Sequence, residues 1–278
     1  YKYKKCRKCE ILPIQFYRKK PFVNLQVQLD TVGSILIKVQ MLIDSGGSDA
    51  IWLFEDSKAE IKTPIRFFNE ILGEGLSGVI LGKRSRIPKL LIGDFEIEKP
   101  TVSFLDSIST KKARRLKNRN GSIGGNILKR FIVWFDYPNK QIRLKKNGSL
   151  KKGFDYNMSG LDIVYGGKQL IKEEVTKPSK VIYSKQADGS NTISFATNYT
   201  YKFKPIYKIK SVVKNSSADK VGLRGGDVIV QINQKLSHSY KLSDIMNKFQ
   251  ERDKKKIKLI VERNGDKLKF EFRLEKKI

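Results

Sequence analysis

The residues with the clearest chemical potential lie in the stretch QMLIDSGGSDAIWLF, from Gln40 to Phe54. Here a run of strand-forming residues stops at Asp44, continues with Ser45 and two glycines, and becomes strongly apolar again. A carboxylate at a strand end can be held by a serine hydroxyl and by backbone N–H groups of the turn, because glycine lets the backbone approach closely. The stretch therefore predicts either a positioned carboxylate that can do chemistry or an ordinary Asp-Ser-Gly turn.

Other catalytic side chains are scarce in this chain. The sole histidine, His238, lies in a polar, loop-like segment, and the only cysteines are Cys6 and Cys9. Serine and cysteine triads need an imidazole base, so we expect neither, and carboxylates must carry the proton transfers of any hydrolysis. The two cysteines cannot complete a tetrahedral zinc site within one chain, and they are either incidental thiols or one local disulfide. We expect no metal and no organic cofactor.

The chain is strongly basic, with 57 Lys and Arg against 28 Asp and Glu and a formal net charge of +29. Such a balance is typical of proteins that bind nucleic acid or an anionic membrane surface. Most lysines are scattered along strand-like segments, however, and only Ser109 to Gly121 forms a concentrated basic run, without a recognised nucleic-acid motif. We interpret this run as a solvated face or loop and expect no specific nucleic-acid partner. No apolar segment is long enough to span a bilayer.

The elements around Asp44 have the pattern of β-strands. Residues 21–30 and 34–44 alternate apolar and polar side chains, as a half-buried hairpin should, and residues 50–54 continue as a short strand. The glycine-rich segment 72–93 predicts a mobile hairpin with tight turns, able to cover a site as a flap. The candidate flap consists of Gly75, Leu76, Ser77 and Gly78.

A second motif follows further along the chain. The sequence GSIGGNIL, residues 121–128, places Ile123 before Gly124 and opens a short helix, and residues 131–144 then suggest two closing strands joined by a Pro-Asn-Lys turn. This order of hairpin, Asp-Ser-Gly, glycine-rich hairpin, Ile-Gly and closing strands resembles the lobe of a retropepsin-like aspartic protease. The resemblance covers residues 13–144.

The resemblance implies that Asp44 is catalytic and that its loop is supported by Ser45, Gly46, Ser48, Ile123 and Gly124. One departure from the family pattern is Asp49, which adds a charge near the site and for which we expect a solvated position at the start of a strand. Bacterial aspartic proteases of this kind can carry a C-terminal PDZ domain and can have an earlier protease-like lobe.

The aspartic mechanism needs two aspartates that share one proton across about 3 Å. This chain has a single Asp-Ser-Gly, so the second aspartate must come from a homodimer mate or from a preceding lobe. We favour the preceding lobe, because the chain starts with Tyr rather than Met and the resemblance allows such a lobe. The alternative is a catalytically inactive protease-like domain that binds peptides together with the PDZ domain.

The C-terminal part contains NSSADKVGLRGGDVIVQINQ, residues 215–234, which is similar to the core of bacterial PDZ domains. Asp227 in this motif is expected to cap the amides of a turn. In such domains a peptide adds as a strand beside the helix, with its carboxylate on backbone N–H groups of the preceding loop. Packing against the protease lobe is an equally good role. The predicted groove residues are Phe203, Pro205, Ile206 and Tyr207 on the strand side and Leu242 and Met246 on the helix side.

The predicted fold is mainly β. It comprises an inter-lobe or N-terminal connection (1–12), a retropepsin-like acid-protease β-barrel lobe (13–150), a linker with additional strands (151–200) and an α+β PDZ domain (201–278). The expected partners are a peptide or protein substrate and a C-terminal peptide at the PDZ domain. The resemblance implies the cell envelope or periplasm of a bacterium, reached through a signal peptide missing from this chain, and leaves the cytoplasm open.

Overall fold

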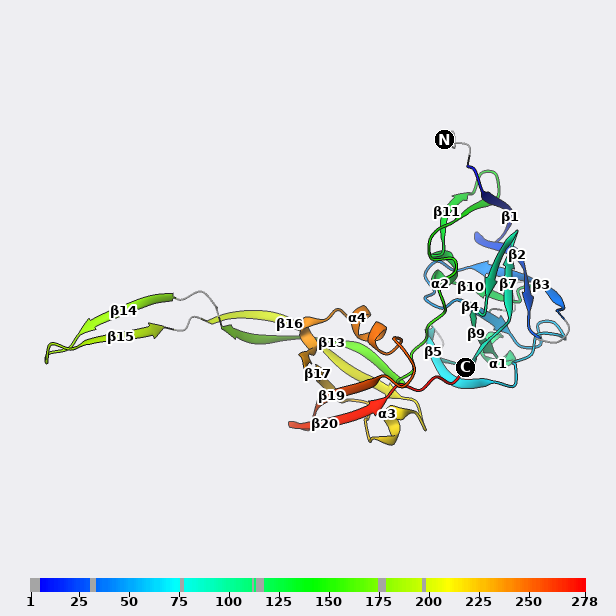
Figure 1. Ribbon diagram of the computed structural model, residues 1–278. Helices are drawn as coiled ribbons and strands as arrows, with labels where there is room; N and C mark the ends of the chain where they lie inside the picture. Colours follow the sequence, from blue (N-terminus) through cyan, green and yellow to red (C-terminus); the bar gives the residue numbers. More distant parts are fainter. Residues whose placement is uncertain are drawn as a thin grey trace. The chain divides into compact units, whose positions relative to one another are not determined.

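The computed structural model describes residues 6–30, 34–75, 78–111, 113, 118–174, 179–196 and 199–278 (Figure 1). The chain divides into two compact units. The first comprises Tyr1–Tyr156 and Lys277–Ile278, and the second comprises Asn157–Lys276. β-Strands dominate both units, so the mainly β fold expected from the sequence is confirmed.

The first unit is built on a sheet of 12 strands among the described residues, with the order β11-β12-β1-β2-β3-β10-β4-β9-β6-β5 and with β7 pairing with β2 and β8. Its strands are β1 (Cys9–Tyr17), β2 (Lys20–Gln28), β3 (Leu36–Ile43), β4 (Ile51–Phe54), β5 (Phe67–Gly75), β6 (Gly78–Arg86), β7 (Lys89–Ile92), β8 (Phe95–Glu98), β9 (Thr101–Leu105), β10 (Gly121–Ile123), β11 (Phe131–Asp136) and β12 (Gln141–Lys146). The short helices are α1 (Ser107–Thr110) and α2 (Gly125–Leu128).

The strand alternation read from the sequence explains the core of the first unit. β2 and β3 pair in antiparallel register from Phe22–Leu42 to Gln28–Leu36. Val23, Leu25 and Val27 of β2 are buried, together with Val39 and Met41 of β3. Because side chains alternate between the faces of a strand, these residues share the face that packs into the core.

β10 occupies the position that organises the site. It lies between β3, with which it pairs in parallel, and β4, with which it pairs antiparallel. The end of β3 therefore meets the end of β10, although the two strands are far apart in the sequence. Asp44 follows β3, and Gly124 follows β10.

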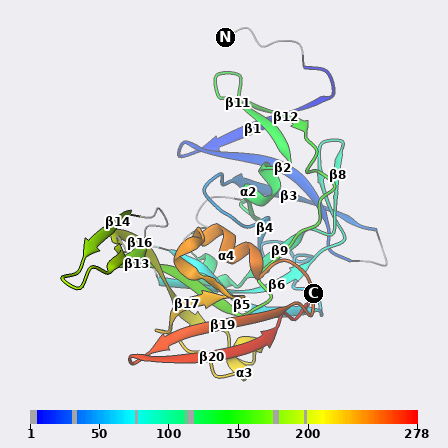
Figure 2. The ribbon, with the colours of Figure 1, turned by 60° about the vertical axis from the view of Figure 1, so that its left-hand side comes forward.

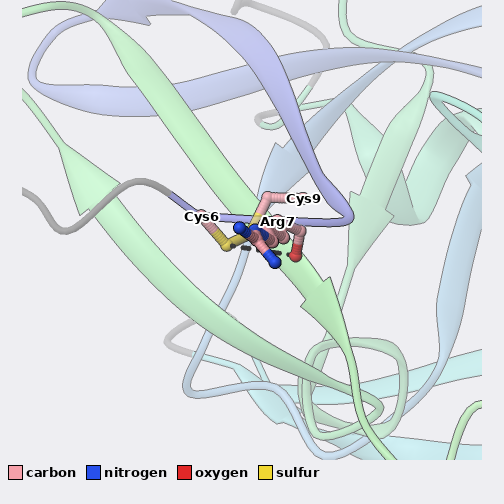
Figure 3. Close-up of a disulfide and its surroundings, with 3 residues drawn as sticks. All are labelled: Cys6, Arg7 and Cys9. Atoms are coloured by element: carbon pink, nitrogen blue, oxygen red, sulfur yellow. Dashed lines mark hydrogen bonds between the residues drawn. A yellow bond between two sulfur atoms is a disulfide. The ribbon is translucent and has the colours of Figure 1, made fainter.

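A disulfide joins Cys6 to Cys9, the first residue of β1, with Arg7 lying between them in the sequence (Figure 3). β1 then pairs first with β12, through Cys9 to Pro13, and afterwards with β2, through Ile14 to Tyr17. The segment expected as a connection from residue 1 to 12 therefore contributes a strand to the first unit, because its backbone pairs with β12.

The second unit contains a six-stranded sheet with the order β13-β16-β17-β19-β20 and β18 pairing with β17, among the described residues (Figure 2). Its elements are β13 (Leu161–Glu174), β14 (Ser179–Lys185), β15 (Asn191–Ala196), β16 (Tyr199–Val212), α3 (Ser217–Lys220), β17 (Val228–Ile232), β18 (Lys235–Leu236), the 3-10 helix η2 (Ser237–Ser239), α4 (Leu242–Lys248), β19 (Lys256–Arg263) and β20 (Asp266–Arg273). β14 and β15 form a separate hairpin.

The segment that we expected to link the domains, residues 151–200, contains β13, β14 and β15. β13 belongs to the sheet of the second unit because it pairs with β16 from Leu161–Val212 to Glu174–Tyr199, with two irregularities in register. The second unit accordingly begins at Asn157, well before the expected start of the PDZ domain.

Candidate functional site

The Asp44 carboxylate is held by the backbone of its own loop. Its Oδ1 accepts hydrogen bonds from the amides of Gly46 (3.2 Å) and Gly47 (3.1 Å). The amide of Asp44 donates to the carbonyl of Ile123 (2.9 Å), which ties the loop to the end of β10. The side chain is exposed, so it is oriented by these contacts and remains accessible to a substrate.

The loop is supported by glycine amides and not by the predicted serine hydroxyls. Ser45 and Ser48 are exposed, and within the described part of the chain neither side chain donates a hydrogen bond to Asp44. Gly47, which we did not single out, supplies the second donor. A glycine three residues after the aspartate is the sequence signal, since it allows the amide to turn back onto the carboxylate.

Gly124 supports the loop from below through close backbone contact. Its amide donates to the carbonyl of Ala50 (3.0 Å), and the next amide, that of Gly125, donates to the carbonyl of Gly47 (2.6 Å). A Cβ atom on Gly124 would lie 2.3 Å from the carbonyl oxygen of Asp49 and 2.8 Å from that of Gly47. Only glycine fits here without a shift of the loop. The predicted juxtaposition of Ile123 and Gly124 with the Asp44 loop is present in the structure.

A pocket of about 250 Å³ adjoins Asp44. The Asp44 loop and β4 form one side, and Leu72, Gly73 and Ile80 line it from the hairpin of β5 and β6. The structure therefore brings the glycine-rich hairpin to the site as expected of a flap. Gly75 and Gly78 form the last described pair of this hairpin, while Leu76 and Ser77 lie outside the described residues.

Asp49, expected to be solvated, is the centre of a partly buried polar cluster. Its Oδ1 pairs with Nη2 of Arg84 (2.9 Å). Its Oδ2 accepts from the indole N–H of Trp52 (2.6 Å) and from the hydroxyl of Ser103 (3.3 Å). Arg84 also pairs with Glu70 through Nε. The difference from the expectation has a physical reason: β6 pairs with β9, and the buried Arg84 needs carboxylate partners.

The charges of this cluster are unequal, since two carboxylates share one guanidinium. Burial raises the pKa of Glu70 above its ordinary value, with the Asp49 charge adding to the rise and Arg84 opposing it. Burial alone would lower the pKa of Arg84, but the two carboxylates outweigh it and raise that pKa. The cluster connects β5 and β6 to the loop that follows Asp44, and it orients Trp52, which lines the pocket.

Arg119 is a second cation near the site, within the basic run that we expected to be solvated. Its Nε donates to the carbonyl of Gly121 (3.1 Å), and its guanidinium carbon lies 5.0 Å from the ring centroid of Phe54. Burial lowers the pKa of Arg119 to about 10, and the charge of Asp44 opposes this shift. Arg119 is thus cationic at neutral pH. Lys112 and residues 114–117 of the same run lie outside the described residues.

In the second unit, the sheet edge beside α4 is formed by a different strand from the one predicted to line the groove. β16 lies between β13 and β17, while β13 is the edge strand of the described sheet and α4 packs against it. Tyr207 of β16 is buried and donates through its hydroxyl to the carbonyl of Tyr240 (2.7 Å). Leu242 and Met246 of α4 are partly buried on the core, as a groove on the helix side requires. The strand side predicted from Phe203, Pro205, Ile206 and Tyr207 is therefore wrong, because β13 occupies the outer edge of β16.

The loop before β13 is closed by its own side chains. Oδ1 of Asn157 accepts from the amide and the hydroxyl of Ser159 (2.9 and 2.6 Å), and the hydroxyl oxygen of Ser159 accepts from the amide of Leu161 (3.0 Å). A peptide carboxylate at this loop would compete with these contacts. Asp227 behaves as predicted, since it caps the amide of Arg224 (2.9 Å), and it also forms a two-point ion pair with Arg263 (2.6 and 2.8 Å) that we did not foresee.

Among the described residues no group of three or more His, Cys, Asp or Glu side chains is arranged to hold a metal ion. No helix in the described ranges is long and apolar enough to cross a bilayer.

A protein-family comparison matches the C-terminal part of the chain. Residues 208–263 match the PDZ domain family, so the C-terminal PDZ domain expected from the sequence is confirmed. No curated protein sequence matches the chain.

Similar solved structures include proteases. One is a retropepsin-like aspartic protease from Rickettsia conorii (15% identity, 52% of this chain and 95% of that chain covered, TM-score 0.29). Another is the HtrA-type protease AlgW with a decapeptide (15% identity, 96% and 79% covered, TM-score 0.30), and a variant of it with a decapeptide also matches (10% identity, 91% and 59% covered, TM-score 0.32). With TM-scores below 0.5, these likenesses do not assign a reaction to this chain.

Proposed function

We propose that the Asp44 site is one half of an aspartic peptidase centre. The observation that carries the proposal is the geometry of the Asp44 loop. The carboxylate is accessible and is oriented by the amides of Gly46 and Gly47, and Gly124 packs closely against the loop backbone. Asp44 lines a pocket that the β5–β6 hairpin also lines. This arrangement suits a group that must present one carboxylate to a bound peptide.

The second carboxylate of this proposal comes from outside the described residues of one chain. Asp49 lines the same pocket, but both of its oxygens are engaged by Arg84, Trp52 and Ser103. Either a homodimer mate or a preceding lobe would supply the second aspartate. Each source would bring a like charge close to Asp44, which is the condition for two carboxylates to retain one shared proton.

The chemistry of the proposed centre is peptide-bond hydrolysis. The ionised carboxylate removes a proton from a water molecule, whose oxygen forms a bond to the scissile carbonyl carbon, while the protonated carboxyl gives its proton to the carbonyl oxygen. The tetrahedral intermediate then collapses, the C–N bond breaks and the leaving amine takes a proton. The β5–β6 hairpin would exclude bulk water from this reaction.

The PDZ domain would bind a peptide by strand addition at β13, beside α4. A second candidate function, a catalytically inactive protease-like unit that acts with the PDZ domain as a peptide-binding module, is favoured by the engagement of Asp49. That engagement leaves Asp44 as the one exposed carboxylate among the described residues of the pocket.

The test is a peptide-library digestion followed by mass spectrometry, across acidic to neutral pH, with the chain and with the longest natural polypeptide that contains it. The proposal expects cleavage within peptides by wild type and none by Asp44→Asn. Ser48→Ala serves as the matched control, because Ser48 lies in the same loop and makes no contact with the Asp44 carboxylate. Binding of peptides without cleavage in both polypeptides would support the binding module instead.

The proposed location is the cell envelope or periplasm of a bacterium. The disulfide between Cys6 and Cys9 supports it, because disulfides persist in oxidising compartments. Finding both thiols reduced in protein isolated from its source without a reductant would contradict this location.

A further inference from the structure

β13 and β16 continue beyond the PDZ sheet as a two-stranded ribbon (Figures 1 and 2). After a bulge between Tyr165 and Lys168, their pairing runs from Lys168–Pro205 to Glu174–Tyr199. β17 pairs with β16 only at Tyr207 and Lys208, so no described third strand accompanies the ribbon. In the described part of the second unit, Lys168, Leu170, Lys172 and Glu174 are exposed on one face of the ribbon, whereas Ile171, Glu173 and Lys204 on the opposite face are partly buried.

One face of this ribbon is apolar and exposed. Residues directly opposite each other in an antiparallel pair lie on the same face, and this face carries the pairs Leu170–Phe203, Lys172–Tyr201 and Glu174–Tyr199. The exposed fractions are 57% for Leu170, 70% for Phe203, 63% for Tyr201 and 48% for Tyr199. Soluble proteins rarely leave such a contiguous apolar surface without a partner.

Lysines are the cations of the described ribbon strands on and opposite this surface. Lys168 and Lys172 lie on the apolar face, and Nζ of Lys172 is 3.7 Å from the ring centroid of Tyr199. Lys202 and Lys204 lie on the opposite face and pair with Glu173 (3.0 and 2.9 Å), while Glu174 is the opposing charge at the far end of the apolar face. The net charge of +29 adds a long-range attraction to anionic surfaces.

This combination matches a lipid surface better than a protein partner. Lysine is depleted in protein–protein interfaces, whereas a bilayer interface accommodates tyrosine rings at the headgroup level and lysine stems that extend toward phosphates. A single-stranded nucleic acid would also stack on aromatic rings. The Leu170–Phe203 pair, with an aliphatic side chain beside the most exposed ring, favours an acyl boundary over a base.

We propose that the apolar face of the ribbon, formed by Lys168, Leu170, Lys172, Tyr199, Tyr201 and Phe203, docks on an anionic lipid bilayer. Phe203 and Leu170 enter the boundary between headgroups and acyl chains, the tyrosines lie among the headgroups, and the two lysines contact lipid phosphates. The ribbon thereby holds the protein at a membrane surface by peripheral contact. This role is independent of the peptidase proposal.

The test is vesicle flotation of the full chain with phosphatidylcholine alone and with phosphatidylcholine mixed with anionic phosphatidylglycerol. We expect binding only to the anionic vesicles, weakening as salt is added because the lysine contribution is screened. The double variant Tyr201→Ser, Phe203→Ser should bind at least about tenfold more weakly, since each removed ring takes apolar area out of the contact. Leu236→Ser is the matched control, because Leu236 is 47% exposed on β18 of the same unit and should bind as wild type does.

The contribution of the lysine charges to vesicle binding is tested by a matched pair of double variants. Lys168→Gln with Lys172→Gln should weaken binding severalfold, whereas Lys267→Gln with Lys269→Gln, which changes the net charge equally on exposed positions of β20, should have a smaller effect. Equal vesicle binding by wild type and the Tyr201, Phe203 double variant would overturn the proposal. So would tight binding of single-stranded oligothymidylate that this double variant loses while vesicle binding is unchanged.

Discussion

Replacing Gly124 by alanine should displace the Asp44 loop. The new Cβ would lie 2.3 Å from the carbonyl oxygen of Asp49, about 1 Å inside ordinary contact distance, and 2.8 Å from that of Gly47. Both obstacles are backbone atoms, so no side chain can rotate away. The loop itself must move, and with it the amide of Gly47 that orients the Asp44 carboxylate.

The size of the effect follows from these contacts. Overpacking of this kind costs about 1–3 kcal/mol of unfolding free energy. A domain of this size loses about 2–4 °C in Tm for each kcal/mol, so the transition of the first unit should fall by about 2–12 °C. If the proposed centre is catalytic, a displacement of about 1 Å can also lower kcat by about a hundredfold.

Differential scanning calorimetry of the full chain measures the Tm change directly. Gly148→Ala is the matched control, because no atom lies within 4 Å of the position of its Cβ. The control should leave the first transition unchanged or slightly higher. Equal Tm values for Gly124→Ala and Gly148→Ala would refute the close contact on which the description of the loop depends.

Two further variants test the polar clusters. Arg84→Met leaves Asp49 and Glu70 without their cation, so the unfolding free energy of the first unit, measured by urea unfolding, should fall by about 3–5 kcal/mol. An unchanged unfolding free energy would contradict the burial of this cluster. Asp227→Asn should cost the second unit about 3 kcal/mol, because Asp227 is buried and paired with Arg263. Burial opposes ionisation of Asp227, but the contacts with Arg263 and with the amide of Arg224 together outweigh it and lower the folded-state pKa of Asp227 below its ordinary value of 3.8. The stabilisation by Asp227 is therefore fully present well above pH 3.8 and is lost as the pH falls through the lowered pKa. Chemical unfolding across this pH range should show this loss for wild type and not for Asp227→Asn.

The sequence could predict those parts of the site that depend on short, local motifs. Asp44 at a strand end and Gly124 after an apolar residue each have a local reason, since a turn and a close backbone approach both require small residues. The cap formed by Asp227 was predictable for the same reason, because its acceptor and the amide of Arg224 belong to one turn.

The long-range contacts were not predictable from the sequence. Arg84 contacts Asp49 only because β6 and β4 both pair with β9. No local sequence pattern predicts that strand pairing. Likewise, the basic run gave no sign that Arg119 is partly buried near Asp44, since charge patterning alone favours solvent.

The prediction of the strand that lines the PDZ groove was wrong for a topological reason. The strand that lies beside α4 is β13, and the chain makes the long excursion of β14 and β15 before it returns as β16 to pair with β13. We placed the groove on the segment nearest to the PDZ motif in sequence, which is an interior strand. The pairing of two strands across such an insertion cannot be predicted from the pattern of consecutive residues.

The most direct test of the central claim is kcat/KM of wild type and Asp44→Asn on one peptide that the library digestion identifies, in a polypeptide or assembly that supplies both aspartates. Asparagine keeps the size of the side chain and can still meet the loop amides through its carbonyl oxygen, but it cannot share a proton as a carboxylate does. If Asp44 is half of the catalytic pair, kcat/KM should fall by at least about a thousandfold with an unchanged Tm. Cleavage by Asp44→Asn at the wild-type rate would contradict the assignment.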